Sequence, residues 1–161
     1  MNIAVIDADL IGRARHRFPN LACMKLSGYY KSQGHTVRLC TDYSSLDQYD
    51  LVFISKVFTN TEIPAEVLRQ EHVSYGGTGF YFDKAPSLPY EIEHHMPDYQ
   101  LYDAFIANSI GSGIPRKEFR LYLDYSIGFL TRGCFRKCDF CVNKNYDRVF
   151  AHSPLLEFYD P

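Results

Sequence analysis

Short apolar runs recur along the first half of the chain and are separated by more polar stretches. Four runs are rich in β-branched and aromatic residues, which predicts buried strands. They are NIAVIDAD at 2–9, TVRLC at 36–40, DLVFISKVF at 50–58 and HVSYGG at 72–77. Residues 19–35 carry apolar side chains at helical spacing, begin with Pro19 and Asn20 and end at Gly34, which predicts a first helix.

The connections between these runs set the predicted fold class. SSLDQY at 44–49 predicts a short helical or turn connection, and IPAEVLRQ at 63–70 a short helix. Strands that alternate with helices and are apolar almost throughout favour a parallel sheet covered on both faces, with right-handed crossovers. The predicted fold is therefore α/β, a Rossmann-like parallel sheet with flanking helices over residues 1–75.

The pattern changes after residue 75. Residues 76–120 are rich in proline and glycine, and only 98–108 have a helical pattern, so this stretch is predicted to be a connector. LYLDYSIGFLT at 121–131 predicts a new strand that runs into a cysteine cluster. A short helix is predicted near the end, with Ser153 as its N-cap and Pro154 as its first residue. The expected units are thus 1–75, 76–120 and 121–161.

Composition and charge limit the classes of function. The 161 residues are 46% hydrophobic and 22% charged, as in ordinary globular proteins. A net charge of -2 gives no global basic field and no clear nucleic-acid signal. No segment approaches the roughly 18 apolar residues of a membrane span, and no secretory signal is recognisable. We therefore expect a cytoplasmic protein without a membrane partner, in which clustered cysteines are metal ligands or redox groups rather than disulfides.

Three of the five cysteines lie within TRGCFRKCDFC at 131–141. One interpretation is a helix on which Cys134, Cys138 and Cys141 line one face as small hydrophobic residues. A second is a zinc site with His152 as fourth ligand, although a second CxxC pair is missing. A third is an iron-sulfur site, in which three thiolates bind three irons of a cubane and the fourth iron has no protein ligand. Gly133 favours a loop, because glycine permits a sharp exit from a strand.

The spacing CxxxCxxC, with TRG before it and an aromatic residue before the last cysteine, resembles the radical S-adenosylmethionine (SAM) enzymes. The resemblance implies that Cys134, Cys138 and Cys141 ligate a 4Fe-4S cluster and that SAM chelates the open iron, with Phe140 against its adenine. It further implies that an external reductant such as flavodoxin or ferredoxin supplies the electron. Reductive cleavage of SAM then gives methionine and a 5′-deoxyadenosyl radical, which abstracts hydrogen from an unknown substrate. Arg136 and Lys137 either offset the charge of the cluster or are solvated.

A Rossmann-like unit ahead of such a motif is similar to the cobalamin-dependent branch of this superfamily. That branch usually carries DxHxxG after the first strand, whereas this loop reads DADLIGRARH, so cobalamin is not expected. Gly12 in the same loop is a lone glycine and does not form a dinucleotide-binding GxGxxG.

Several other polar positions have more than one possible role. GGTG at 76–79 is either a cradle for a phosphate or cofactor tail, or a flexible turn. Asp7 and Asp9 follow the first strand, where they bind a ligand or act as caps. His94 and His95 are expected to be exposed or locally hydrogen-bonded, and Cys23 and Cys40 to be buried thiols.

Chain length bears on the catalytic domain that the resemblance implies. A complete (β/α) barrel needs roughly 250 residues, so residues 121–161 would supply only its first strand and cluster loop. We therefore expect either the amino-terminal portion of a larger radical SAM enzyme or a truncated gene product. The alternative is a non-enzymatic Rossmann-like module with a zinc-binding or redox-sensing cysteine cluster.

Overall fold

A parallel sheet forms the centre of the molecule. The computed structural model describes residues 1–13, 16 and 18–161. In this part of the chain, four strands lie in the order β2-β1-β3-β4, and all neighbours are parallel. Their bounds are Asn2–Asp7 for β1, Thr36–Leu39 for β2, Leu51–Ser55 for β3 and Val73–Gly76 for β4. The prediction of a Rossmann-like parallel α/β sheet is confirmed.

The first predicted helix is the longest in the described residues. α2 spans Leu21–Ser32, and the side chain of Asn20 accepts hydrogen bonds from the backbone N–H groups of Ala22 and Cys23. Gly34 has a φ of 80° and ends the helix region in the left-handed conformation that glycine favours. The remaining α-helices are α1 (Ala8–Gly12), α3 (Ala65–Leu68), α4 (Thr78–Tyr81), α5 (Tyr90–Glu93), α6 (Asp103–Gly111) and α7 (Arg120–Leu123). Short 3-10 helices are η1 (Leu46–Gln48), η2 (Phe82–Lys84), η3 (Arg116–Phe119) and η4 (Leu155–Glu157).

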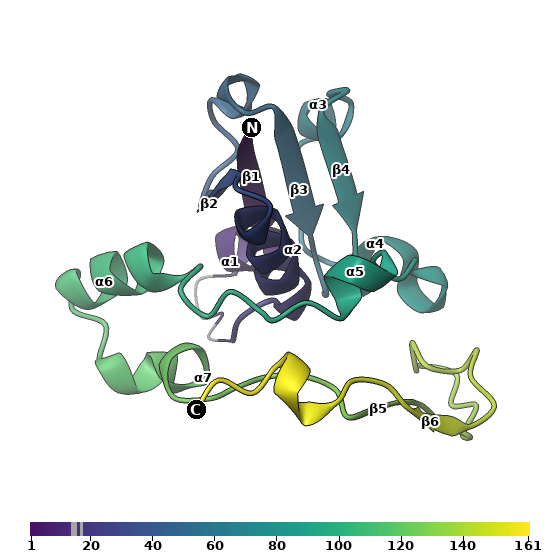
Figure 1. Cartoon of the computed structure of the whole chain (residues 1–161). Coiled ribbons are helices and arrows are strands. Elements are labelled where there is room, and N and C mark those ends of the chain that lie inside the picture. The colour runs from purple at the N-terminus through teal and green to yellow at the C-terminus, as the bar shows by residue number, and fades with distance from the viewer. Residues whose placement is uncertain (14–15, 17) are drawn as a thin grey trace.

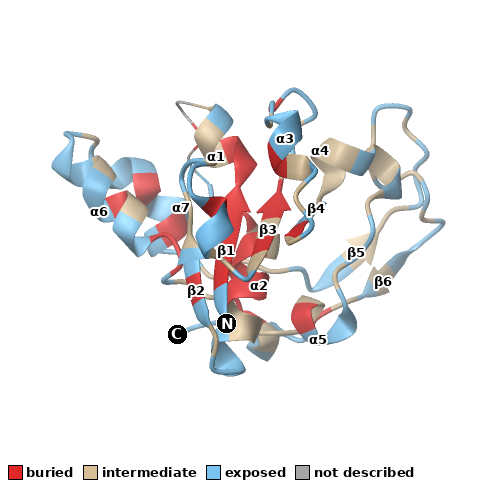
Figure 2. Ribbon diagram, turned by 90° about the horizontal axis from the view of Figure 1, so that it is seen from above, coloured by how far each residue is buried: buried red, intermediate tan, exposed pale blue. Residues whose placement is uncertain are grey.

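The sheet has a hydrophobic cluster on each face. One cluster joins Ala4, Ile6 and Val52 to residues of η1, α3 and β4. The other joins β1 to α2, and it also contains Ile92, Leu101, Tyr102, Ile106, Phe119 and Tyr122. Burial is concentrated on β1, β3 and α2 (Figure 2). The segment 76–120 therefore contributes much of the packing on one face of the sheet.

The predicted strand over 121–131 is wrong. Residues 120–123 form α7, residues 124–130 have no regular structure, and only Thr131–Gly133 form a strand, β5. Tyr122 is buried, and Asp124 pairs with Arg116 and Arg120 across the helical turn. These contacts favour a helix over the apolar alternation that suggested a strand. β5 pairs antiparallel with β6 (Val149–Ala151), which the sequence pattern did not predict.

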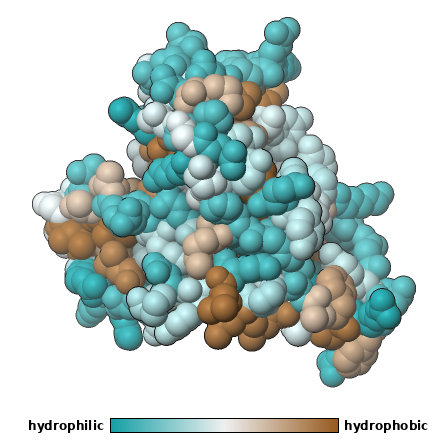
Figure 3. Space-filling model, in the orientation of Figure 1, coloured by the Kyte–Doolittle hydropathy of each residue, from teal (hydrophilic) through white to brown (hydrophobic). Residues whose placement is uncertain are grey.

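The carboxyl-terminal third lies as a separate layer below the sheet (Figure 1). β3 and β4 point with their carboxyl ends toward α5 and this layer, whose right-hand end in the view is the β5–β6 hairpin. Apolar residues are exposed along it in Figure 3, and Phe129, Leu130, Phe135 and Leu156 are all at least 46% exposed. η4 occupies the place of the predicted final helix, with Pro154 at its N-cap position instead of Ser153. Among the described residues, no helix has the length and apolar character needed to cross a membrane.

Candidate functional site: a cysteine loop beside a cleft

Gly133 ends β5 and begins the cysteine loop. Its φ is 83°, in the left-handed region of backbone conformation, which residues other than glycine adopt at a cost of roughly 1–2 kcal/mol. A Cβ at this position would lie 2.3 Å from the carbonyl oxygen of Arg148, the residue that precedes β6 in the facing arm of the hairpin. Gly133 therefore allows the turn out of β5, as its place in the sequence predicts, and it also allows the close approach of the two arms of the loop, which was not predicted.

Backbone amides point at two of the three sulfurs in the loop. The N–H of Arg136 donates to Sγ of Cys134, and the N–H of Asn143 donates to Sγ of Cys141, both at 3.4 Å. The N–H of Cys141 donates to the carbonyl oxygen of Cys138 at 3.0 Å, which closes the turn between them. Hydrogen bonds from N–H groups stabilise a thiolate and tune the potential of a cluster bound to it. The loop thus has local features of a thiolate site.

Lys137 connects the two arms of the cysteine loop. Its ammonium donates to the carbonyl oxygens of Lys144 and Tyr146 at 2.9 and 2.7 Å and pairs with the Asp147 carboxylate at 2.5 Å. This hydrogen bond lowers the pKa of the Asp147 carboxyl. Lys137 is therefore a structural tie within the loop, a role that its place in the sequence did not predict.

The four ligands of the proposed zinc site do not form a compact set in the structure. They are Cys134, Cys138, Cys141 and His152. Within residues 1–13, 16 and 18–161, no group of three His, Cys, Asp or Glu side chains lies close enough to hold a metal ion. His152 bonds to Ser153 through Nδ1 at 2.9 Å and lies 3.5 Å from Glu93 through Nε2. In the part of the chain that the structure describes, His152 is thus bonded to other partners and is not brought together with the three thiols as one ligand set.

Phe140 lies at the tip of this loop. Its side chain is 85% exposed and Phe135 is 68% exposed. Large aromatic rings at such exposure are suited to stack on a ligand. The assignment of Phe140 to an adenine ring stays a prediction.

A partly buried ionic cluster joins the β5–β6 hairpin, which carries the cysteine loop, to the sheet layer. Oε1 of Glu93 lies 2.7 Å from NH2 of Arg132 and 3.4 Å from Nζ of Lys25, and 12% of the Glu93 side chain is exposed. Burial lowers the pKa of the Lys25 ammonium, and the Glu93 carboxylate acts in the opposite direction. Burial together with the charge of Arg132 lowers the pKa of His152, which favours a neutral imidazole. We call Lys25, Glu93 and Arg132 the junction triad.

A cleft of about 730 Å³ lies beside this triad. Its walls come from the start of α2, the carboxyl ends of β3 and β4, the segment 82–93 and the cysteine hairpin. The hairpin contributes Phe129, Arg132, Val142, Asn143, Asn145 and Tyr146. Asn145 also donates to the carbonyl oxygen of Asp83 at 2.6 Å, which ties the hairpin to the opposite wall. The volume is in the range of small-molecule sites, and the position at the carboxyl edge of a parallel sheet is where ligands of open α/β folds bind.

Asp7 and Asp9 are fully buried at the carboxyl edge of the sheet, where other parts of the chain donate hydrogen bonds to them. Tyr102 donates to Oδ2 of Asp7 at 2.9 Å, and the backbone N–H of Val57 donates to Oδ2 of Asp9 at 2.6 Å. The Thr61 hydroxyl also donates to Asp9. Both carboxylates thus have structural partners. Ala14 and Arg15, which belong to the loop DADLIGRARH that lacks the cobalamin-binding histidine motif, lie outside the described residues.

The remaining candidates have structural partners, which for His94 and His95 include residues distant in sequence. Thr78 of the GGTG segment donates to the carbonyl oxygen of Val57, and Gly77 has a φ of 106°. His94 bonds to Glu157 at 2.7 Å, and His95 bonds to the carbonyl oxygen of Met96 and to the Ser32 hydroxyl. Burial, followed by the charges of Asp7 and Asp9, raises the pKa of the Cys23 thiol, and burial raises that of Cys40. Cys23 and Cys40 are therefore poor metal ligands.

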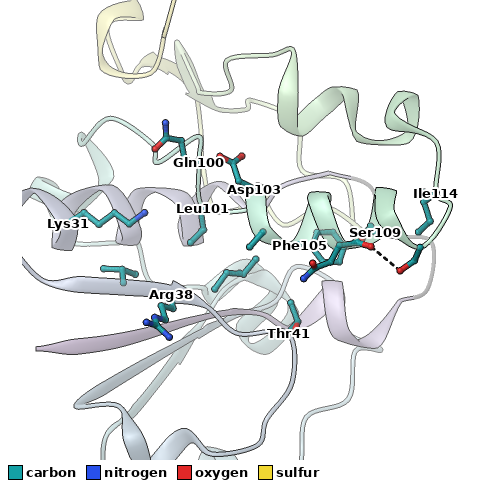
Figure 4. Close-up of a pocket in the computed structure, with 14 residues that line it drawn as sticks. Lys31, Arg38, Thr41, Gln100, Leu101, Asp103, Phe105, Ser109 and Ile114 are labelled. Carbon is teal, nitrogen blue, oxygen red and sulfur yellow. Dashed lines mark hydrogen bonds between the residues drawn. The ribbon is translucent and has the colours of Figure 1, made fainter.

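A second cavity of about 800 Å³ lies between α2, α6 and the edge strand β2 (Figure 4). It contains side chains such as Lys31, Arg38 and Asp103 (Figure 4). In Figure 1, α6 and the cysteine hairpin lie at opposite ends of the molecule. The second cavity therefore belongs to a different region from the cysteine loop.

No family model, curated protein or solved structure matches the chain. The class that the structure supports is a Rossmann-like α/β protein, and the function must be argued from the site alone.

Proposed function

We propose that the chain is a radical SAM protein that binds a 4Fe-4S cluster through Cys134, Cys138 and Cys141. The observation that carries the proposal is the CxxxCxxC loop directly after a strand that ends in Gly133, with backbone N–H groups donating to two of its sulfurs. When bound, such a cluster has one iron without a protein ligand and supplies the electron that cleaves the sulfonium of SAM to methionine and a 5′-deoxyadenosyl radical.

The residues around the loop have definite roles in this proposal. The amides of Arg136 and Asn143 stabilise two thiolates, and Lys137 holds the two arms together. Phe140 offers an exposed ring for the adenine of SAM. The cleft beside the hairpin gives a substrate a place next to the loop and partly removed from water. The identity of the substrate is considered below, and the electron comes from an external reductant such as flavodoxin or ferredoxin.

Anaerobic reconstitution tests the proposal against the alternative module. The chain is incubated with iron and sulfide in one arm and with zinc in the other, and bound metal is counted after desalting. We expect about four irons per chain with the broad visible absorbance of an iron-sulfur cluster. One tightly held, colourless zinc ion and no retained iron would favour the non-enzymatic zinc-binding module instead. A reversible disulfide among the three loop cysteines without metal would favour the redox-sensing module.

A further inference from the structure

The charges that line the cleft are unevenly distributed, with both cations at the junction triad. Its charged lining residues are Lys25, Arg132, Glu93 and Asp83. Asp83 lies 3.5 Å from Nζ of Lys144, which does not line the cleft, so this carboxylate is neutralised from outside. The two cations Lys25 and Arg132 then share one carboxylate, that of Glu93. The wall at the junction triad is therefore positively charged.

Lys25 and Arg132, the cations of the junction triad, have N–H groups that are not used in hydrogen bonds to the described residues. Only 4% of the Lys25 side chain is exposed, and within residues 1–13, 16 and 18–161 its Nζ donates to the backbone and side-chain oxygens of Glu93 alone. Among the described residues, nothing accepts a hydrogen bond from the buried Nε of Arg132. The next carboxylate, Glu157, is bonded to His94 at 2.7 Å and does not line the cleft. A buried cation without a full set of acceptors is stabilised by an anionic ligand.

Aromatic rings lie among aliphatic and small side chains in the rest of the cleft lining. Tyr30 and Phe53 stack with their ring centroids 5.3 Å apart, and Tyr75, Phe129 and Tyr146 line other parts of the wall. The guanidinium of Arg132 lies 4.4 Å from the centre of the Phe129 ring, so an aromatic surface continues up to the charged wall. Aromatic walls with a few polar groups favour flat, mainly apolar ligands, and the amides of Asn143 and Asn145 can hydrogen-bond to ring substituents.

We propose that this cleft binds a substrate that combines an aromatic or heteroaromatic ring with a carboxylate, and that Lys25 and Arg132 receive the carboxylate. The inference rests on the proposed function, because it takes the ligand to be the substrate of the chemistry at the cysteine loop. Arg132, Asn143 and Tyr146 lie on the hairpin that carries this loop and also line the cleft. The ring lies on the aromatic surface of the cleft, and the acid competes with Glu93 for the two cations.

Matched pairs of probes test this assignment on the full chain without a cluster, kept reduced and anaerobic. The pairs are benzoate and benzamide, nicotinate and nicotinamide, and indole-3-acetate and indole-3-acetamide. Binding is measured by saturation-transfer NMR and calorimetry. We expect at least one acid to bind saturably and roughly tenfold or more tightly than its amide, as charge-assisted hydrogen bonds to a carboxylate imply.

Two variants with opposite expected effects separate a binding role from loss of folding. Lys25→Met is expected to lower the affinity of the acid to that of the amide. Glu93→Gln is expected to raise it, since it releases both cations, and misfolding cannot produce tighter binding. Lys117→Met removes an exposed lysine outside the cleft and serves as control, with no change expected.

Three results would overturn the assignment. They are no acid binding more tightly than its amide, an unchanged preference in folded Lys25→Met, and displacement of the acid by SAM in the cluster-free chain, which would make the cleft a SAM site. Because no cluster is present, these results are independent of the iron measurement. If no cluster forms but the acid binds as expected, the radical chemistry fails and the ligand site stands.

Discussion

The five cysteines of this chain fall into two groups with different surroundings. Cys134, Cys138 and Cys141 are half-buried on a loop held by backbone amides and by Lys137. Cys23 is completely buried between α2 and β1, where it lies 3.6 Å from the carbonyl oxygen of Ile6. Cys40 is half-buried beside the hydroxyl of Tyr49. The first group is the one to which the proposed function assigns the cluster.

Single alanine substitutions should separate these groups. Replacing Cys134, Cys138 or Cys141 should remove most of the iron after anaerobic reconstitution, because each thiolate is expected to bind a different iron. Cys23→Ala and Cys40→Ala are the matched controls and should cost only packing, on the order of 1 kcal/mol. Iron per chain and thermal unfolding are measured for all five variants. Equal iron retention in all five would contradict the ligand assignment.

Gly133→Ala should damage the cysteine loop more than strain alone explains. The new methyl group would meet the carbonyl oxygen of Arg148 at 2.3 Å, in addition to a cost of roughly 1–2 kcal/mol for the left-handed backbone. Gly113→Ala is the control, since Gly113 has a φ of 95° but open space around its Cβ position. We expect the Gly133 variant to lose iron binding and the Gly113 variant to retain it. Similar iron contents would show that the close approach at Gly133 is unimportant.

At the residue scale, the sequence could predict what depends on neighbours along the chain. The cysteine spacing and Gly133 are local features, and φ at Gly133 agrees with the prediction. The junction triad was missed because it joins three elements that are distant in sequence, α2, α5 and β5. No local pattern marks Lys25 as a buried cation, since it follows Met24 on a helix that reads as ordinary and amphipathic.

At the scale of elements, burial on both faces made the sheet predictable. β1 and β3 are continuous apolar runs because helices cover both sides of them, and all four strands were found. The failure at 121–131 has the opposite cause. Leu121 and Leu123 are exposed, so their hydrophobic side chains do not mark a buried strand. The burial of Tyr122 and the ion pairs of Asp124 with Arg116 and Arg120 stabilise helix α7 instead.

The loop after β1 leads to a prediction about cobalamin. Asn20 belongs to a hydrogen-bonded network at the edge between β1 and β3: its side-chain amide donates to the Ser55 hydroxyl at 3.0 Å, and its backbone N–H donates to the Tyr102 hydroxyl at 3.0 Å. A cofactor tail would have to displace this network, and the loop lacks the histidine motif. Titration with hydroxocobalamin should therefore give no saturable spectral change, with a protein that carries DxHxxG as positive control. A micromolar dissociation constant would contradict this prediction.

At the scale of the whole molecule, residues 76–120 are part of the packed structure. Ile106 and Phe119 are buried in the same cluster as β1 and α2. Tyr102 reaches the sheet edge, where its hydroxyl bonds to Asp7 and accepts from the N–H of Asn20. Proline and glycine content alone does not reveal such packing, because the buried residues of this segment are widely spaced between turns.

Tyr102→Phe tests this integration. It would leave the buried Asp7 carboxylate and the N–H of Asn20 without this partner, at a cost of about 1–3 kcal/mol in the free energy of unfolding. Tyr90→Phe is the control, since Tyr90 is 72% exposed and should change stability by no more than about 0.5 kcal/mol. Urea unfolding of the two variants gives the difference. Equal stabilities would indicate that the 76–120 segment does not brace the sheet edge.

The central claim, a cluster with an open iron that SAM occupies, is tested most directly by electron paramagnetic resonance. The chain is reconstituted anaerobically, reduced with dithionite, and its spectrum is recorded with and without saturating SAM. The account predicts the signal of a reduced 4Fe-4S cluster whose g values shift when SAM is added, and no such signal in Cys138→Ala. A cluster spectrum that SAM leaves unchanged, or a chain that holds no reducible cluster, would contradict it.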